Sequence, residues 1–186
     1  MKGISEMATQ NLIFIDESGA NLGMTRSYAR GVGGERIKMP AGMLHGPKLS
    51  MISAISVEEV VSSLYGEWST DGDIFLAFIQ KCLVPKLTPG KKVVMDNVPF
   101  HKMQSVREAI EATGAELEFL PAYSPDFSPI ENMWSKIKTI LQKFSARNLK
   151  EFKKAIKVAF KSITQKDLLG WFKHCGYNVQ LSGKPL

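Results

Sequence analysis

Two short apolar segments that each lead to an aspartate constrain the fold of this chain more than any other feature. The first, NLIFID, spans Asn11–Asp16, and the second, KKVVMDN, spans residues 91–97 and contains Asp96. Short apolar runs of this kind are typical of buried strands. If the two strands are neighbours in one sheet, both carboxylates emerge side by side at one edge. Each aspartate alone is equally compatible with an ordinary turn or a helix cap.

The period of the apolar residues predicts the other elements. After a turn at Gly19 and Asn21, strands at Leu22–Arg30 and Leu49–Val57 are expected to complete an antiparallel meander with the first strand. A helix follows over Ile74–Leu83, capped by Asp71 or Asp73. The later elements are a helix around Val106–Thr113 ending at Gly114, a strand at Ala115–Leu120, a helix from Pro129, and helices at Asn148–Ile163 and Gln165–Cys175. This order predicts a mixed five-stranded sheet covered by helices.

Length and composition indicate one globular domain. The chain has 186 residues, 44% of them apolar and 23% charged, which argues against general disorder. No apolar run approaches the roughly 20 residues needed to span a bilayer, and the first ten residues lack the apolar stretch of a secretory signal. Cys82 and Cys175 belong to no metal-binding spacing, so free thiols in a reducing compartment are expected.

Charge is distributed unevenly along the chain. Residues 1–131 carry 12 Lys and Arg against 16 Asp and Glu, a balance of −4. Residues 132–186 carry 12 against 2, a balance of +10, which together with the first part gives the net +6. A metal site beside a polyanion-binding surface fits this division, and a set of solvated basic helices fits it equally well.

The helix expected at Asn148–Ile163 has a lysine stripe on one face. The stripe consists of Lys150, Lys154, Lys157 and Lys161, which are spaced by three or four residues. Contact with DNA phosphates is one interpretation of this face, and a solubilising surface is the other.

A third acid, Glu131, has two interpretations. Ser128-Pro129-Ile130-Glu131 fits a capping box, in which the serine and the glutamate cap the first turn of a helix. Glu131 could instead join Asp16 and Asp96 around a divalent cation. Clustered carboxylates repel one another unless a cation lies between them, and Mg²⁺ prefers oxygen ligands.

Three ordered motifs decide between these interpretations. VVMDNVPFHK contains Asp96, FLPAYSPDFSPIENMWSKIK contains Glu131, FIDESG contains Asp16, and 34 residues separate Asp96 from Glu131. Over roughly residues 11–176 the chain resembles the mariner superfamily of DDE transposases, particularly its bacterial insertion-sequence branch. The motifs match that family in order and in spacing.

The resemblance implies a fold, a chemistry and partners. The implied fold is ribonuclease H-like, with a mixed five-stranded sheet flanked by helices and extra helices at the C-terminal end. Asp16, Asp96 and Glu131 would bind two Mg²⁺ or Mn²⁺ ions and catalyse DNA cleavage and strand transfer. The implied partner is double-stranded DNA, both transposon ends and a TA target, bound by a homodimer that assembles on DNA at the nucleoid of the bacterial cytoplasm. Two other functions stay open: an inactive DNA-binding or assembly fragment, and a structure-specific nuclease on the same fold.

Several residues next to the triad are expected to be site neighbours and not metal ligands. They are Asn97, His101 and Asn132. Asn97 would orient Asp96, contact DNA or simply form a turn, and His101 would contact a phosphate, position water or cap the next helix. Tyr123 and Trp134 are candidates for stacking on a base, although core packing is the better interpretation of Trp134.

The expected domain organisation is simple. Residues 1–10 form an N-terminal tail, 11–176 the catalytic domain with basic helices from about residue 148, and 177–186 a C-terminal tail. Relatives carry helix-turn-helix domains before the first aspartate, whereas only fifteen residues precede Asp16 here. We therefore expect the domains that recognise transposon ends to be supplied by another polypeptide or to have been lost.

Overall fold

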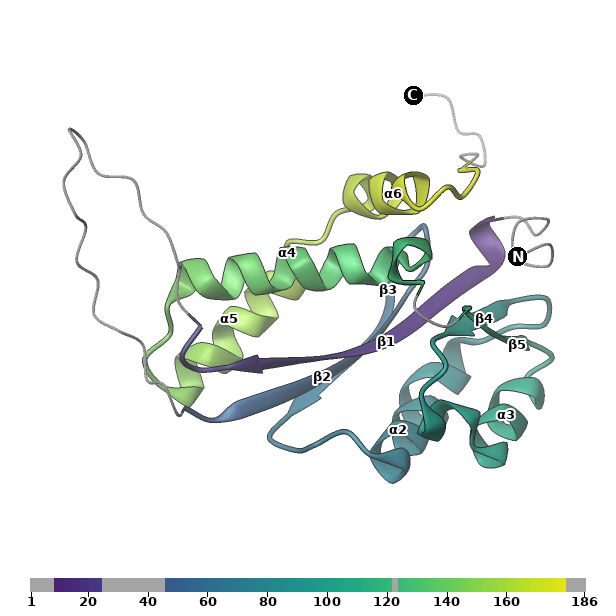
Figure 1. Ribbon diagram of the computed structural model, residues 1–186, viewed down its shortest axis with the longest axis horizontal. Helices are drawn as coiled ribbons and strands as arrows, with labels where there is room; N and C mark the ends of the chain where they lie inside the picture. Colours follow the sequence, from purple (N-terminus) through teal and green to yellow (C-terminus); the bar gives the residue numbers. More distant parts are fainter. Residues whose placement is uncertain (1–8, 25–45, 122–123, 180–186) are drawn as a thin grey trace.

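A five-stranded mixed sheet forms the centre of the structure, a computed structural model that describes residues 9–24, 46–121 and 124–179 (Figure 1). The strands are β1 (Leu12–Asn21), β2 (Lys48–Ile55), β3 (Val60–Gly66), β4 (Lys92–Met95) and β5 (Glu116–Phe119). Their order across the sheet is β3-β2-β1-β4-β5. The first three strands pair antiparallel, while β1, β4 and β5 run parallel. The mixed sheet predicted from the sequence is therefore confirmed.

The register between β1 and β4 brings the two aspartates to the same level. The strands are parallel neighbours and pair Phe14 with Val94. Continued by two residues, this register sets Asp16 opposite Asp96, which directly follows β4. The prediction that these two strands lie side by side is confirmed.

The first strand is longer than predicted. Asp16 does not end it, because β1 continues to Asn21 and pairs along its second half with β2. The turn predicted at Gly19 and Asn21 begins only at Asn21, whose carbonyl accepts from the backbone N–H of Met24, while Gly19 lies within the strand. Hydrogen bonding to a neighbouring strand has overridden the preference of Gly19 for a turn.

The third strand of the meander lies elsewhere than predicted. A strand was expected at Leu22–Arg30, but Leu22 and Gly23 form a turn and residues 25–45 lie outside the described residues. The meander is completed by β3, to which the sequence analysis assigned no element. The turn from β2 to β3 is held by the Ser56 hydroxyl, which accepts from the backbone N–H groups of Glu58 and Glu59.

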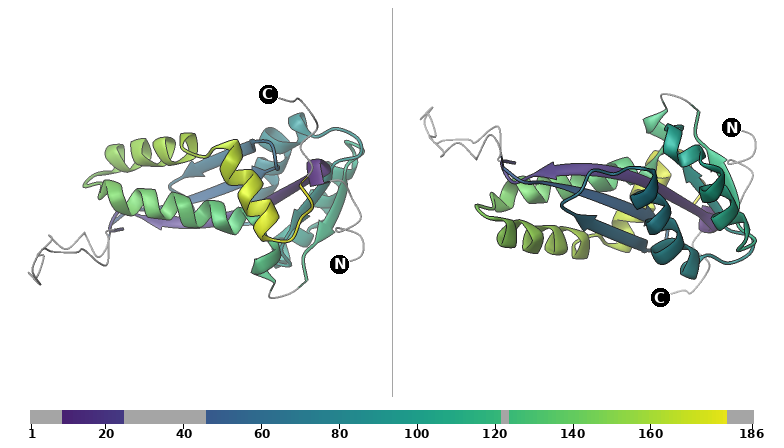
Figure 2. Two further views of the ribbon diagram at one scale, coloured as in Figure 1. Left: turned by 90° about the horizontal axis from the view of Figure 1, so that it is seen from above. Right: turned by 90° about the horizontal axis from the view of Figure 1, so that it is seen from below.

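Helices cover both faces of the sheet (Figures 1 and 2). One face carries α4 (Pro129–Phe144), α5 (Leu149–Lys161) and α6 (Gln165–His174). The other carries α2 (Gly72–Phe78), the π-helical segment η3 (Ile79–Leu83) and α3 (Gln104–Glu111). Short 3-10 turns connect these elements: η1 (Thr9–Asn11), η4 (Val84–Lys86), η5 (Pro99–Lys102) and η6 (Pro125–Phe127).

Helix ends follow the predicted signals. Asp71 caps α2 by accepting from the backbone N–H of Ile74, and Gly114 follows α3 with a positive φ of 79°. Within the described ranges, no helix is long and apolar enough to cross a membrane.

The alternation of side chains along β1 divides the core in two. Leu12 and Phe14 face the layer of α4, α5 and α6, whereas Ile13 and Ile15 face α2 and α3. The same alternation directs Asp16 toward α4 and the following residue, Glu17, toward the α2 side. Adjacent acids of one strand therefore enter different environments.

Candidate functional site

One pocket brings together the three acids singled out by the motifs. Asp16 from β1, Asp96 after β4 and Glu131 at the start of α4 all line a cavity of about 490 Å³. The loops that follow β4 and β5 form the remaining wall, with Pro99 and Leu120 among the lining residues. Three elements that are far apart in sequence thus present carboxylates to a single space, as the sequence analysis predicted.

The pKa of Asp16 reflects both its burial and the acids around it. Burial, and to a smaller extent the negative charges of Glu17, Glu131 and Asp96, raise it from 3.8 to about 7. Removal from water and the neighbouring negative charges both disfavour the ionised carboxylate, and burial is the larger of the two effects. A cation in the pocket would reverse the effect.

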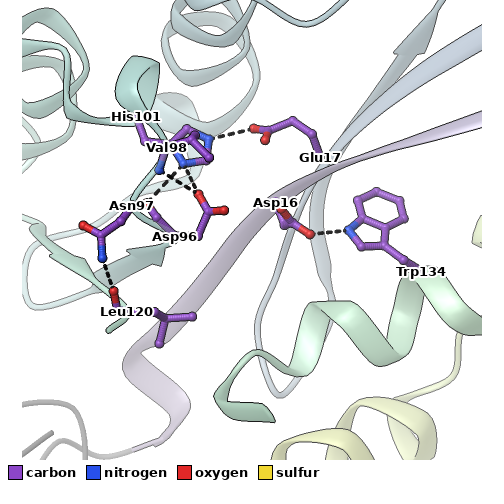
Figure 3. Close-up of polar contacts among 8 residues, drawn as sticks. All are labelled: Asp16, Glu17, Asp96, Asn97, Val98, His101, Leu120 and Trp134. Carbon is purple, nitrogen blue, oxygen red and sulfur yellow. Dashed lines mark hydrogen bonds and ion pairs between the residues drawn. The ribbon is translucent and has the colours of Figure 1, made fainter. Parts of the chain in front are cut away.

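Asp96 is held by a buried histidine (Figure 3). Nδ1 of His101 lies 2.7 Å from Oδ1 of Asp96, and Nε2 lies 2.9 Å from Oε1 of Glu17. An imidazole donates from both nitrogens only when it is protonated. Burial by itself would lower the pKa of His101, but the hydrogen bonds to Asp96 and Glu17 outweigh it and raise the pKa to about 9. The same contact lowers the pKa of Asp96.

His101 is therefore a cation inside the protein that links the end of β4 to β1. Its side chain is completely buried and is packed against the rings of Phe75 and Phe100. This position fits the expected site neighbour that is not a metal ligand, since both ring nitrogens are engaged. Its burial also leaves it no surface to offer a DNA phosphate.

The side chain of Glu131 does not take part in capping α4. Ser128 occupies the N-cap position, but its side chain makes no capping hydrogen bond. In a capping box the side chain of Glu131 would accept a hydrogen bond from the backbone N–H of Ser128. That N–H donates instead to the carbonyl of Pro125 in the turn η6, at 2.9 Å, so the capping-box interpretation is not supported. The Glu131 side chain is exposed at the pocket.

Trp134 is a core residue with a polar contact to the site. It is 1% exposed, in agreement with core packing and against stacking on a base. Its indole Nε1 donates to Oδ2 of Asp16 at 3.0 Å (Figure 3). The other stacking candidate, Tyr123, lies outside the described residues.

The two asparagines have structural contacts. Nδ2 of Asn97 donates to the backbone carbonyl of Leu120 and joins the ends of β4 and β5, and Asn97 also lines the pocket. Nδ2 of Asn132 lies 3.8 Å from Sγ of Cys175, which follows α6. Asn97 is thus a neighbour of the pocket, whereas Asn132 points toward the C-terminal segment.

The pocket offers the donor set that hard divalent cations prefer. Asp16, Asp96 and Glu131 supply only carboxylate oxygens, the ligands of choice for Mg²⁺. Among the described residues, no three His, Cys, Asp or Glu side chains are close enough to hold one ion as they stand. Because mutual repulsion separates carboxylates that lack a counter-charge, binding would require them to approach, and the exposed Glu131 is free to do so.

Comparison with known proteins connects this geometry to a family. The sequence profile described as DDE superfamily endonuclease matches residues 11–153. The chain belongs to the DDE superfamily of endonucleases.

Solved structures show the fold of this DDE endonuclease. The "Mos1 transposase paired-end complex with left transposon end" matches with a TM-score of 0.70 and 15% identity over 90% of this chain and 52% of that one. The "Mos1 mariner paired end complex with Mn" gives 0.70 and 13% over 94% and 55%. The "catalytic domain of Mos1 mariner transposase" gives 0.64 and 13% over 90% and 78%.

These matches confirm the predicted ribonuclease H-like fold. The chain spans about half the length of the chains in the paired-end complexes. No curated protein matches its sequence. The part of the chain that matches the DDE family profile contains Asp16, Asp96 and Glu131, whereas α6 lies outside the matched part.

Two contacts at the site were not predicted from the sequence: that of Glu17 with His101 and that of Trp134 with Asp16. Glu17 directly follows Asp16, and its adjacency to a predicted ligand on a strand was the available signal: the next residue of a strand faces the opposite layer. No feature of the sequence predicts the hydrogen bond from Trp134 to Asp16. The spacing of three residues places Trp134 on the same helix face as Glu131. That its indole N–H donates to Asp16 is known only from the packing of α4 against β1.

Proposed function

We propose that this DDE endonuclease is the catalytic domain of a transposase, with Asp16, Asp96 and Glu131 as its catalytic carboxylates. The observation that carries the proposal is the convergence of these three acids on one pocket, where burial and the neighbouring negative charges raise the pKa of Asp16 to about 7. Perturbed carboxylates in a cavity are a physical sign of a functional site.

The chemistry is phosphoryl transfer in two steps. Water forms a bond to the phosphorus at the transposon end while the bond to the 3′-oxygen breaks, which frees a 3′-hydroxyl. That hydroxyl then attacks a target phosphodiester and displaces the target's own 3′-oxygen. Two bound Mg²⁺ or Mn²⁺ ions would activate the attacking oxygen and stabilise the leaving one. Asp16, Asp96 and Glu131 would hold these ions, and the contact of His101 with Oδ1 restricts the orientation of the Asp96 carboxylate.

The finer assignments rest on the motifs. FIDESG, VVMDNVPFHK and LPAYSPDFSPIEN resemble the bacterial insertion-sequence branch, which supports a TA target, a homodimer assembled on DNA and a cytoplasmic, nucleoid-associated enzyme. The similar structures of Mos1 transposase include complexes with a transposon end, with Mn and with Mg. Packing of α6 against α4 supports a catalytic domain that covers residues 11–176.

A nicking assay tests the proposal. Supercoiled plasmid is incubated with Mn²⁺ and either the wild-type chain or Glu131→Gln, and we expect nicked circles only with wild type. An inactive wild-type chain that binds DNA would favour the assembly-fragment alternative. Faster cleavage of RNA–DNA hybrids than of DNA duplexes would favour a hybrid nuclease on this fold.

DNA binding by this chain is predicted to show little sequence preference. Within residues 132–179 the cationic side chains are lysines on α4, α5 and α6 together with Arg147 before α5, and contacts to phosphates carry no sequence information. Competition between labelled duplex and unrelated DNA at fixed salt measures this. Discrimination above roughly a hundredfold would reach the range of specific binders and contradict the prediction.

The lysine stripe of α5 is proposed to contact DNA phosphates. Lys150, Lys154, Lys157 and Lys161 are exposed, and within the described ranges none of them forms an ion pair. The helix has one acid, and Glu151 is engaged at its N-terminus, where it accepts from Arg147 and Asn148. Lys150, Lys154 and Lys157 also line an open hollow of about 620 Å³.

Changing all four lysines to Gln is predicted to weaken binding to every DNA sequence alike. Each lost phosphate contact should flatten the plot of log affinity against log salt by about one unit. The matched control replaces the same four lysines by Arg, which retains the charge and should keep the wild-type slope. A Gln variant with the wild-type slope would leave the stripe as a solvated surface.

A further inference from the structure

The indole of Trp134 is an unusual partner for the acid at the centre of the pocket. A buried tryptophan N–H needs an acceptor, and here the acceptor is Oδ2 of Asp16 at 3.0 Å. The contact spans 118 residues of sequence and joins α4 directly to β1. Trp134 is therefore more than a filler of the apolar core.

The hydrogen bond restricts how Asp16 presents its oxygens. With Oδ2 accepting from α4, the carboxyl group of Asp16 has a defined orientation in the wall of the pocket. The bond also limits rotation of α4 about its axis. Glu131 lies three residues before Trp134 on the same helix face, so fixing Trp134 against Asp16 fixes the position from which Glu131 reaches the pocket.

Packing alone does not require the nitrogen. The ring of Trp134 lies edge-on to Phe160, with centroids 6.2 Å apart, and belongs to the apolar layer of α4, α5 and α6. A phenylalanine at this position would retain an aromatic ring in that layer and lose only the donor and some volume. The two roles of the side chain are therefore separable by substitution.

We propose that Trp134 is a positioning residue that orients Asp16, and through α4 also Glu131, for binding a divalent cation. This inference rests on the proposed function, because it assumes a cation in the pocket. Partners that orient a metal-binding carboxylate typically change metal affinity by about 10–100-fold when they are removed.

The test compares Mn²⁺ affinity of wild type and Trp134→Phe by calorimetry at pH 8, where Asp16 is ionised in the wild-type chain. We expect affinity to fall about 10–100-fold in the variant while circular dichroism stays unchanged. Trp171→Phe is the matched control, because Trp171 is a partly buried tryptophan of α6 that packs on the same layer, and it should bind Mn²⁺ like wild type. Wild-type affinity in folded Trp134→Phe would overturn the proposal and reduce Trp134 to packing.

A second measurement needs no change at position 134. In nitrogen-15-labelled wild-type protein, the Trp134 indole resonance, distinguished from those of Trp68 and Trp171 by single substitutions, should shift as Mg²⁺ is added. The shift should saturate with the affinity found by calorimetry. An indole resonance indifferent to Mg²⁺, or a wild-type chain that binds neither ion, would also overturn the inference. A wild-type chain that binds Mn²⁺ but does not nick DNA would instead refute the proposed function, and the effect of Trp134→Phe on Mn²⁺ binding would still decide the inference.

Discussion

Replacing Asp16 or Asp96 by Asn, or Glu131 by Gln, is expected to reduce Mn²⁺-supported nicking of supercoiled DNA by about a thousandfold or more. Under the proposed function, each substitution removes a carboxylate that would bind the metal from the pocket that the three acids share. A thousandfold loss corresponds to about 4 kcal/mol of activation free energy, a reasonable loss when charge stabilisation by a metal site fails. Nicking rates at saturating Mn²⁺ provide the measurement, with circular dichroism as the check on folding.

The Asp16→Asn variant should combine this loss of activity with a gain in stability. In the metal-free protein the pKa of Asp16 is raised from 3.8 to about 7, which means that the folded state favours the protonated carboxyl group. The stability of the fold with respect to this group is therefore full below pH 3.8 and is lost as pH rises through 7, where the buried carboxyl group must ionise. Asn does not ionise and avoids that loss. In EDTA at pH 8 we expect the free energy of unfolding to rise by about 1–3 kcal/mol, and no gain at pH 4.

The exposed Glu131 provides the comparison for both measurements. Glu131→Gln should lose activity to the same extent while changing stability little, since solvent already screens its charge. Nicking within tenfold of wild type in any one folded variant would remove that residue from the triad. Equal stability of Asp16→Asn and wild type at pH 8 would mean that the pKa of Asp16 is not raised in the free protein.

The sequence predicted the part of the fold that carries the triad and missed the part that depends on pairing between strands. β1 and β4 were recognisable because each contains a short apolar run that leads to an aspartate. β3 was missed because it lies at the edge of the sheet and its adjacent polar residues Ser62 and Ser63 interrupt the apolar alternation. The continuation of β1 through Gly19 is stabilised by pairing with β2, which no local pattern reveals.

The site shows the same division between local and long-range information. Asp16, Asp96 and Glu131 were recognisable from motifs and their spacing. The contacts that hold two of them were not, because each joins segments distant in the chain: 118 residues separate Trp134 from Asp16, and 84 separate His101 from Glu17. The local sequence around Glu131 fits a capping box that the structure does not form. A capping box requires a free backbone N–H on Ser128, and in the structure that N–H donates to Pro125 in the turn before α4.

Replacing His101 by Gln is expected to weaken both the fold and the activity. The two arms of the His101 bridge differ in solvent exposure: the Glu17 side chain is 17% exposed and the Asp96 side chain 51%. Most of the stability should therefore come from the Glu17 arm, where solvent screens the charges less. We expect the free energy of unfolding in EDTA to fall by about 2–3 kcal/mol, below the range for fully buried pairs because Asp96 is screened. Loss of orientation at Asp96 should lower nicking by about 10–100-fold.

The pH dependence separates the charge of His101 from its packing. Its pKa is raised from 6.5 to about 9 in the folded protein, so the stability it contributes is full below pH 6.5 and is lost as pH rises through 9. The difference in unfolding free energy between wild type and His101→Gln should therefore shrink by about 1–3 kcal/mol between pH 6 and pH 9.5. Glu17→Gln is the control: it keeps an acceptor for Nε2 but removes the charge, so it should retain part of the stability and flatten this pH dependence. A difference between wild type and His101→Gln that stays constant over this range would mean that His101 is neutral and acts only by packing against Phe75 and Phe100.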